Sequence, residues 1–202
     1  MEDNQKNKNE DDRLFLARKN NLEKIIDSGL DPYPKSFPRT HSSVDSVNTL
    51  EEFEKGSLEE SSLEDVKIAG RVVGIRGQGK MIFMDVKDRY GVIQVASKLD
   101  LLLDKFEIVK LVDIGDIVGF SGKIFRTRRG EPSLEVSDLT MLSKAMRPLP
   151  DKWSGLKDVE KRYRQRYLDL ISSEDSFNTA MKRAEIVSFI RNFMNEKGYI
   201  EV

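Results

Sequence analysis

Residues 66–96 read VKIAGRVVGIRGQGKMIFMDVKDRYGVIQVA, and this stretch decides the fold. Apolar side chains alternate with other residues in three runs, at positions 66–72, 82–86 and 92–96. Alternation with a period of two is typical of strands that bury one face. Turn-forming residues separate the runs, first at Gly77-Gln78-Gly79 and then at positions 88–91. The stretch therefore predicts three consecutive antiparallel strands joined by short turns.

The segments that follow predict how the sheet closes. Residues 99–112 have the apolar spacing of a helix, and two further strands are expected at 116–126 and 133–142. Three strands, a helix and two strands make the element order of an OB-fold, a five-stranded barrel that binds oligonucleotides. A sandwich would need more strands, and a parallel α/β fold would need a helix after each strand. We therefore predict a mainly β fold with flanking helices, in which an OB-fold barrel occupies residues 66–143.

Helical segments are expected on both sides of this barrel. The N-terminal extension, residues 1–65, is predicted to start with a disordered polar segment, followed by helices at 11–28 and 44–55. Residues 144–172 contain two prolines and are interpreted as a linker or hinge that becomes helical from residue 156. Residues 173–202 form the last predicted segment, a long helix at about 176–197 followed by the start of a strand.

Composition excludes several classes of protein and of site. The chain has 202 residues, no cysteine and one histidine, His41, so disulfides, thiolate metal sites and Cys–His catalysis are excluded. No apolar run approaches the ~18 residues needed to cross a bilayer, and the polar N-terminus lacks a signal region, so a cytoplasmic location is expected. The glycines around Gln78 lack the spacing of a P-loop. No carboxylate cluster has metal-ligand spacing, and no metal site is predicted.

Charge is distributed unevenly along the chain. Residues 1–65 contain 9 Lys and Arg against 16 Asp and Glu, residues 66–130 contain 13 against 7, and residues 131–202 contain 12 of each. Residues 66–130, which make up most of the predicted barrel, therefore carry a basic excess of +6. A basic segment in a nearly neutral chain favours a polyanion site, although a solvated surface rich in lysine would give the same count.

Four residues are candidates for contact with a nucleic acid. Alternation buries Ile82 and Met84, so Phe83 must point outward, where its ring can stack on a base. Gln94 points outward from the third strand and can read a base edge with its amide. Glu131 lies in a basic loop between the last two strands and can accept a base N–H, and Arg76 at the end of the first strand can contact phosphate or a base. Each residue alone is also compatible with an ordinary surface position, or for Phe83 with a place under a loop or helix.

Two further stretches carry a family resemblance. Residues 142–158 read LSKAMRPLPDKWSGLKD and residues 162–170 read RYRQRYLDL. Together they resemble the junction between barrel and catalytic domain in class II lysyl-tRNA synthetases. The barrel adds Ala69-Gly70-Arg71, Gly115-Asp116 and the loop at 126–131, and residues 177–202 resemble the first class II motif. The resemblance runs from about Arg13 to the end, and it identifies residues 173–202 as the truncated start of an α+β catalytic domain.

The resemblance implies a function and a set of roles. Phe83 is expected to stack on an anticodon uridine, and Arg76, Gln94 and Glu131 are expected to be polar anticodon readers. The implied partner is the anticodon stem-loop of tRNA(Lys), and the full-length enzyme is expected to be a homodimeric lysine--tRNA ligase that uses ATP and Mg²⁺. Met81 and Ile82 depart from the small residues usual in the family, and the first motif stops at Val202 before its usual proline.

The later class II motifs, which carry the ATP-binding arginines, are absent from these 202 residues. The chain alone is therefore expected to bind tRNA without catalysis, with no catalytic residue and no cofactor of its own. One alternative is a free-standing OB-fold RNA-binding module derived from a synthetase, and another is the synthetase-like portion of a fusion that lysylates something else. The coding sequence after Val202 distinguishes these possibilities, since the later motifs or a stop codon would follow.

Overall fold

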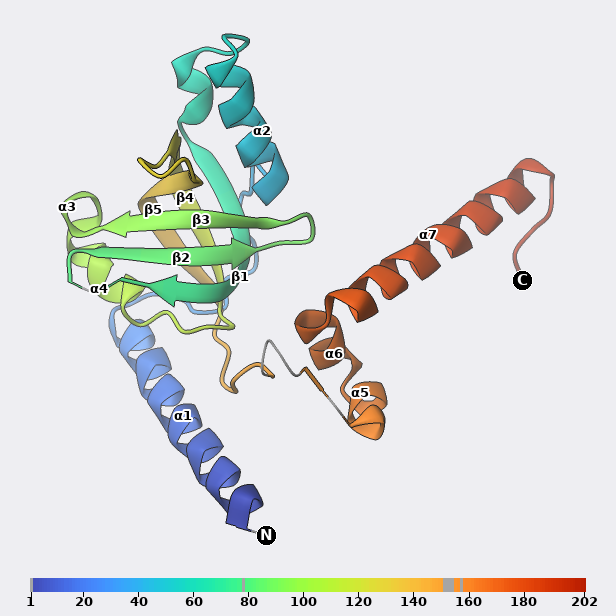
Figure 1. The fold of residues 1–202 in the computed structure, drawn as a ribbon, viewed down its shortest axis with the longest axis horizontal. Coiled ribbons are helices and arrows are strands. Elements are labelled where there is room, and N and C mark those ends of the chain that lie inside the picture. The colour runs from blue at the N-terminus through green and yellow to red at the C-terminus, as the bar shows by residue number, and fades with distance from the viewer. Residues whose placement is uncertain (1, 78, 151–154, 157) are drawn as a thin grey trace. The chain divides into compact units, whose positions relative to one another are not determined.

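The computed structural model describes residues 2–77, 79–150, 155–156 and 158–202. The chain divides into two compact units, Met1–Pro148 and Leu149–Val202, and each is described by itself (Figure 1). Two residues named above, Gln78 of the first predicted turn and Trp153 of the linker stretch, lie outside the described residues.

The first unit is built around a closed five-stranded barrel with the strand order β1-β2-β3-β5-β4. Only β3 and β5 pair in parallel, and pairing of β1 with β4 completes the ring. The predicted OB-fold is confirmed. The strands are β1 (Val66–Arg76), β2 (Met81–Lys87), β3 (Val92–Lys98), β4 (Ile117–Arg126) and β5 (Pro132–Ser143).

The connection between β3 and β4 is helical, as expected, but it is not one helix. Two α-helical turns, α3 (Leu99–Leu102) and α4 (Phe106–Val109), flank a 3-10 turn, η2 (Leu103–Lys105). Leu103 has φ of +49°, which lies outside the right-handed helical region, so α3 ends there. Leu102, Phe106 and Val109 all enter the core.

Alternating side chains of the strands fill the barrel. On β2, Ile82, Met84 and Val86 are buried, while Phe83 and Asp85 are only half-buried on the opposite side. Burial of apolar surface at about 25 cal/mol per Å² is the main stabilising contribution to such a core. The largest fully buried side chains are Phe106, Phe120, Ile25, Met84, Ile124, Leu134 and Met141.

Two helices flank the barrel. The first, α1 (Glu2–Asp27), starts well before the predicted residue 11 and extends through most of the segment that was expected to be disordered. The first residues of α1 include Glu, Gln and Lys, which are good helix formers. The expectation of disorder was based on their low hydrophobicity and did not include this helix propensity. The second helix, α2 (Ser43–Glu54), begins with a capping box between Ser42 and Asp45. A 3-10 turn, η1 (Glu60–Leu63), leads into β1.

The second unit consists of three helices, α5 (Val159–Arg164), α6 (Arg166–Ser172) and α7 (Glu174–Glu196). Asp169 is almost fully buried and accepts bonds from Arg162 at 3.0 Å and Arg166 at 2.8 Å, which ties α5 to α6. The strand predicted at residues 199–202 is not formed. A strand needs a neighbouring strand for its hydrogen bonds, and the described residues of this unit offer none.

In the described part of the chain, no helix combines the length and hydrophobicity needed to cross a membrane.

Candidate nucleic-acid interface

Strand pairing brings three of the four candidate residues onto one outer face of the barrel. Arg76 on β1 pairs with Phe83 on β2, and Phe83 pairs with Ala96 on β3. In the adjacent row, Asp85 pairs with Gln94, and Gln94 pairs with Ser133 on β5. The face therefore consists of two neighbouring rows that cross the sheet, and we call it the β1–β2–β3–β5 face.

A β-bulge puts Arg76 on this face. The β1–β2 register shifts between Val72 and Gly74, so that Ile75 packs against the core and Arg76 lies beside Phe83. A bulge inserts one residue and so reverses the side to which all later residues of the strand point. Without it, alternation from Val72 would have turned Arg76 inward.

Phe83 occupies the middle of the first row and is partly exposed. Its neighbour on β3, Ala96, has only a methyl side chain and is 1% exposed. Ala96 is therefore too small to cover the Phe83 ring. A partly exposed aromatic ring on a flat sheet face is the feature that single-stranded nucleic-acid sites use to stack bases.

Arg76 is held by a carboxylate that the sequence analysis did not single out. Its Nη1 and Nη2 atoms donate to Asp85 Oδ2 at 3.0 Å and Oδ1 at 2.9 Å. Nη2 also donates to Gln94 Oε1 at 2.7 Å. A two-point pair of this kind fixes the guanidinium plane. The signal for Asp85 was present in the sequence, since it stands two residues after Phe83 and therefore on the same face.

Gln94 is bonded at both ends of its amide. Its Oε1 accepts from Arg76, and its Nε2 donates to Ser133 Oγ at 2.8 Å. Ser133 is fully buried, and its hydroxyl donates in turn to the backbone oxygen of Glu131 at 3.3 Å. Ser133 was not foreseen, because its place beside Gln94 depends on the parallel pairing of β3 with β5.

Glu131 lies at the edge of the face, in the loop between β4 and β5. Its backbone is fixed, because Thr127 N donates to Glu131 O and Glu131 N donates to Thr127 Oγ1, both at 3.0 Å. The side chain is exposed, and among the described residues no group bonds to its carboxylate. The loop thus presents an acceptor whose position is set by the main chain.

The basic loop is less free than the sequence suggested. Arg126 Nε and Nη2 bind both carboxylate oxygens of Glu54 on α2 at 2.7 Å, and Nη1 donates to Gly130 O at 2.8 Å. These bonds lower the pKa of Glu54 below its ordinary value. Arg128 and Arg129 are exposed, so they are the loop cations best placed for a phosphate.

A second aromatic ring, Phe125 on β4, lies next to Ser133 in the register. The Nζ atom of Lys98 stands 5.9 Å from the centre of this ring, and Lys98 also forms an ion pair with Glu135. The face therefore offers a partly exposed aromatic at each side of the Gln94–Ser133 pair.

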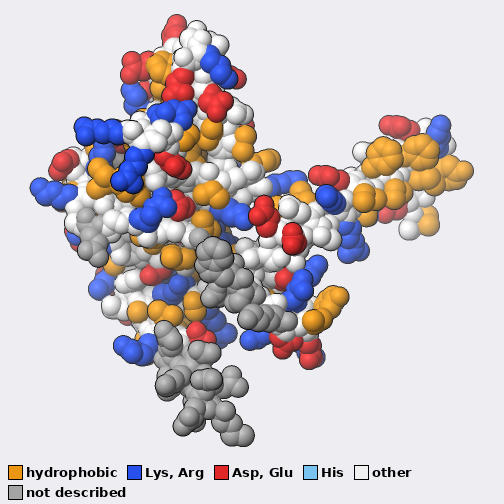
Figure 2. Space-filling model, viewed as in Figure 1, with side chains coloured by type: hydrophobic (Ala, Val, Ile, Leu, Met, Phe, Trp, Pro, Cys, Tyr) orange, Lys and Arg blue, Asp and Glu red, His pale blue; other side chains and the backbone are white. Residues whose placement is uncertain are grey.

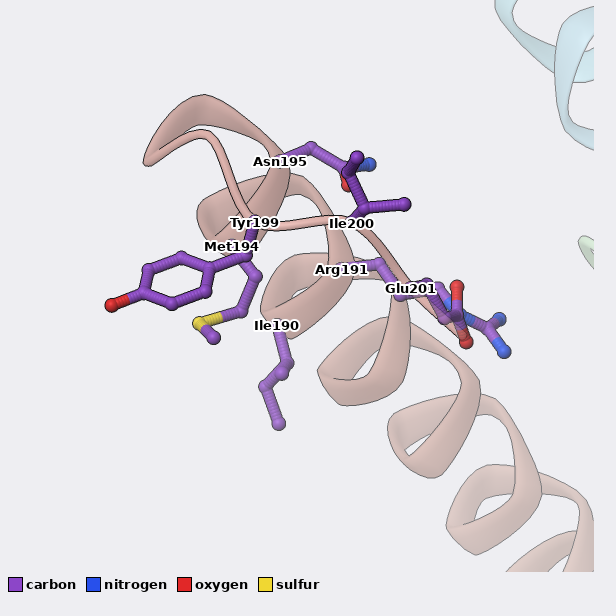
Figure 3. A pocket seen from close by; sticks show the side chains of 7 residues that line it. All are labelled: Ile190, Arg191, Met194, Asn195, Tyr199, Ile200 and Glu201. Carbon is purple, nitrogen blue, oxygen red and sulfur yellow. The ribbon is translucent and has the colours of Figure 1, made fainter.

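The hollow drawn in Figure 3 belongs to the second unit and not to this face. It has a volume of about 260 Å³ and is formed by the end of α7 and the residues after it, with Tyr199 beside Met194. In the described residues of the whole chain, no three His, Cys, Asp or Glu side chains are grouped so that they can hold a metal ion.

Comparison with known proteins agrees with the fold. Residues 66–142 match the family described as OB-fold nucleic acid binding domain. The lysine--tRNA ligase of Bacillus cytotoxicus is 43% identical over 201 residues, which is 99% of this chain and 40% of that protein. The lysine--tRNA ligase of Dehalococcoides mccartyi is 46% identical over 190 residues, which is 94% of this chain and 38% of that protein.

The chain spans about two fifths of the length of these relatives. The resemblance seen in the sequence is confirmed over nearly the whole chain. The chain is a homologue of part of the lysine--tRNA ligases, and its barrel matches the family described as OB-fold nucleic acid binding domain.

Proposed function

We propose that this chain is the anticodon-binding part of a lysine--tRNA ligase and that its barrel binds the anticodon stem-loop of tRNA(Lys). The observation that carries the proposal is the placement of Phe83, Arg76 and Gln94 on one face of an OB-fold. Identity of 43–46% to lysine--tRNA ligases supports it. The whole protein would join lysine to this tRNA using ATP, as a homodimer in the cytoplasm.

Each side chain has a role in this proposal. Phe83 stacks on a base of the loop, and the two polar residues Gln94 and Glu131 read its edge. Uridine offers an N3–H donor that a carboxylate accepts, whereas cytidine presents a bare acceptor at that position. Glu131 suits uridine for this reason, and its carboxylate would repel a phosphate. Arg128 and Arg129 supply the attraction to the backbone.

The proposal assigns ATP and Mg²⁺ to the whole protein and not to a site in this chain. The described residues hold no cluster of metal-ligating side chains, and the later class II motifs do not occur in the 202 residues. We therefore assign no step of adenylate formation or transfer to these residues. The chain alone is expected to show no lysine-dependent exchange of pyrophosphate into ATP.

The test is a titration of the chain with labelled anticodon stem-loops that carry either uridine or cytidine at the middle loop position. The uridine loop should bind more tightly, and Glu131→Gln should reduce the preference by about tenfold, the usual value of one base-edge contact. Glu131→Gln keeps the size of the side chain and removes its charge. Glu107→Gln, on the exposed side of α4, removes the same charge elsewhere and is the matched control. Equal affinity for both loops would contradict the proposed function.

A further inference from the structure

A chain of hydrogen bonds links four elements of the face. Asp85 on β2 holds Arg76 on β1, which donates to Gln94 on β3. Gln94 donates to Ser133 on β5, which donates to the backbone of Glu131. The chain of bonds includes the three polar candidate readers together with two residues, Asp85 and Ser133, to which no role has been given.

We propose that Asp85 and Ser133 are positioning residues that determine base specificity on this face. Ser133 and Arg76 together fix the direction of the Gln94 amide, and Asp85 keeps Arg76 from acting as a phosphate clamp. The inference rests on the proposed function and specifies which groups make the face read a uridine rather than any base.

The direction of an amide decides which pyrimidine it matches. With Glu131 accepting the N3–H of uridine, the amide NH₂ of Gln94 can donate to uridine O4, whereas cytidine presents an N4–H donor at that place, which only the amide oxygen can accept. A glutamine that is free to flip its amide therefore pairs with either base. At Gln94 a flip would turn the amide NH₂ toward the Arg76 guanidinium, which has only donors, and would lose the bond to Ser133.

Burial strengthens this restraint. Ser133 is fully buried, so water cannot replace Gln94 as a partner of its hydroxyl. Loss of the bond to Gln94 would therefore leave a polar group unpaired. Its single proton is directed to the backbone oxygen of Glu131, which leaves a lone pair for Gln94 Nε2. The hydroxyl therefore accepts from the amide, and only one amide direction satisfies both groups.

The backbone is adapted to the Asp85 carboxylate. A Cβ atom at residue 74 would lie 2.6 Å from Asp85 Oδ2, so a side chain there would force this carboxylate to shift. The Asp85 side chain is 25% exposed and that of Arg76 is 57% exposed. The pair carries no net charge, and in this state Arg76 adds nothing to the counterions that RNA binding releases.

The experiment uses Asp85→Asn and Ser133→Ala in the full 202-residue chain, with the uridine and cytidine stem-loops as probes at several salt concentrations. Ser133→Ala should reduce the preference for uridine by about tenfold, with no change in the dependence of affinity on salt. Asp85→Asn should tighten binding of both loops at low salt and steepen the slope of log affinity against log salt by about 0.7, the value for one added phosphate contact on a single strand.

Matched controls separate these effects from a general change in charge. Asp138→Asn removes the same charge further along β5, where Asp138 pairs with Lys105, and should leave the slope within error of the unsubstituted chain. Asp85→Asn keeps the size of a side chain on the outer face of the barrel. The salt slope of this variant therefore tests the inference even if Ser133→Ala lowers the stability of the fold.

Failure of the inference differs from failure of the proposed function. If the unsubstituted chain binds neither loop, the proposed function is wrong and the inference falls with it. If the chain prefers uridine but both variants keep its preference and its salt slope, the inference alone is overturned. A slope change shared by Asp85→Asn and Asp138→Asn would also overturn the role of Asp85.

Discussion

Gly74 is the residue on which the order of the β1–β2–β3–β5 face most depends. A Cβ there would meet Asp85 Oδ2 at 2.6 Å, so Gly74→Ala should displace the carboxylate and destabilise the barrel by about 1–3 kcal/mol, the usual effect of overpacking. Urea unfolding followed by circular dichroism measures this change. Asp85→Ala in the Gly74→Ala background should recover most of the loss. If the effects of the two substitutions on the free energy of unfolding are additive, the close contact between residue 74 and Asp85 does not cause the destabilisation.

The residues of the face were predictable to different degrees. Phe83 and Gln94 followed from alternation alone, because one buried residue fixes the facing of its neighbours in a strand. Arg76 was placed on the face only by the bulge before Gly74, which the alternation rule does not contain. Ser133 depends on which strands become neighbours, and strand order is a property of the whole barrel.

At the scale of elements, the carboxylate of Asp88 holds the start of α2 to the turn between β2 and β3. Asp88, in the turn between β2 and β3, accepts from Ser43 N at 2.7 Å and Ser43 Oγ at 2.6 Å at the start of α2. It also accepts from Tyr90 N and Gly91 N in its own turn. Asp88 therefore fixes both the hairpin turn and the first turn of the helix.

This attachment should make stability depend on pH. Burial raises the pKa of Asp88, but its hydrogen bonds from Ser43, Tyr90 and Gly91 outweigh that effect and leave the pKa below the ordinary value. A lowered pKa in the folded state contributes stability above the unfolded pKa of about 3.9, and the contribution is lost as pH falls through the folded pKa.

We expect Asp88→Asn to lower the free energy of unfolding by about 1 kcal/mol at pH 7, a typical effect of a weakened helix cap. The difference from the unsubstituted chain should shrink steadily below pH 4, as measured by urea unfolding across that range. A difference that is constant from pH 7 to pH 2.5 would show that the Asp88 charge has no part in holding α2.

Elements were predicted well in type and less well in extent. Period-two alternation located the first three strands, since each buries one face in the same core, and the last two strands also lie where they were expected. The segment after β3 had helical spacing because Leu102, Phe106 and Val109 all enter the core, and that spacing did not reveal the break at Leu103. Tertiary packing, not local propensity, fixes such breaks.

At the scale of the whole molecule, the two units differ in how completely they bury their apolar residues. The barrel encloses its core, whereas α7 exposes large apolar side chains, among them Phe189 at 70% and Ile190 at 53%. Figure 2 shows hydrophobic side chains gathered along this helix. Exposed apolar patches of this kind favour self-association.

Deletion of residues 175–202 should therefore leave the barrel folded and make the chain more monodisperse. The residues of the hydrophobic core all lie between residues 25 and 141, so the deletion removes none of them. Size-exclusion chromatography with light scattering measures the association, and thermal unfolding by circular dichroism measures the barrel. Loss of the cooperative unfolding transition on deletion would show that the barrel depends on the helices that follow it.

Base stacking on Phe83 is tested most directly by measuring the affinity of Phe83→Ala for a uridine-rich anticodon stem-loop across a range of salt concentrations. The substitution should weaken binding by about 1–3 kcal/mol, the range for loss of one base–aromatic stack, and leave the salt slope unchanged because no charge is removed. Circular dichroism checks that the variant is folded. A folded Phe83→Ala chain that binds this RNA as tightly as the unsubstituted chain would contradict the assignment of the RNA-binding face.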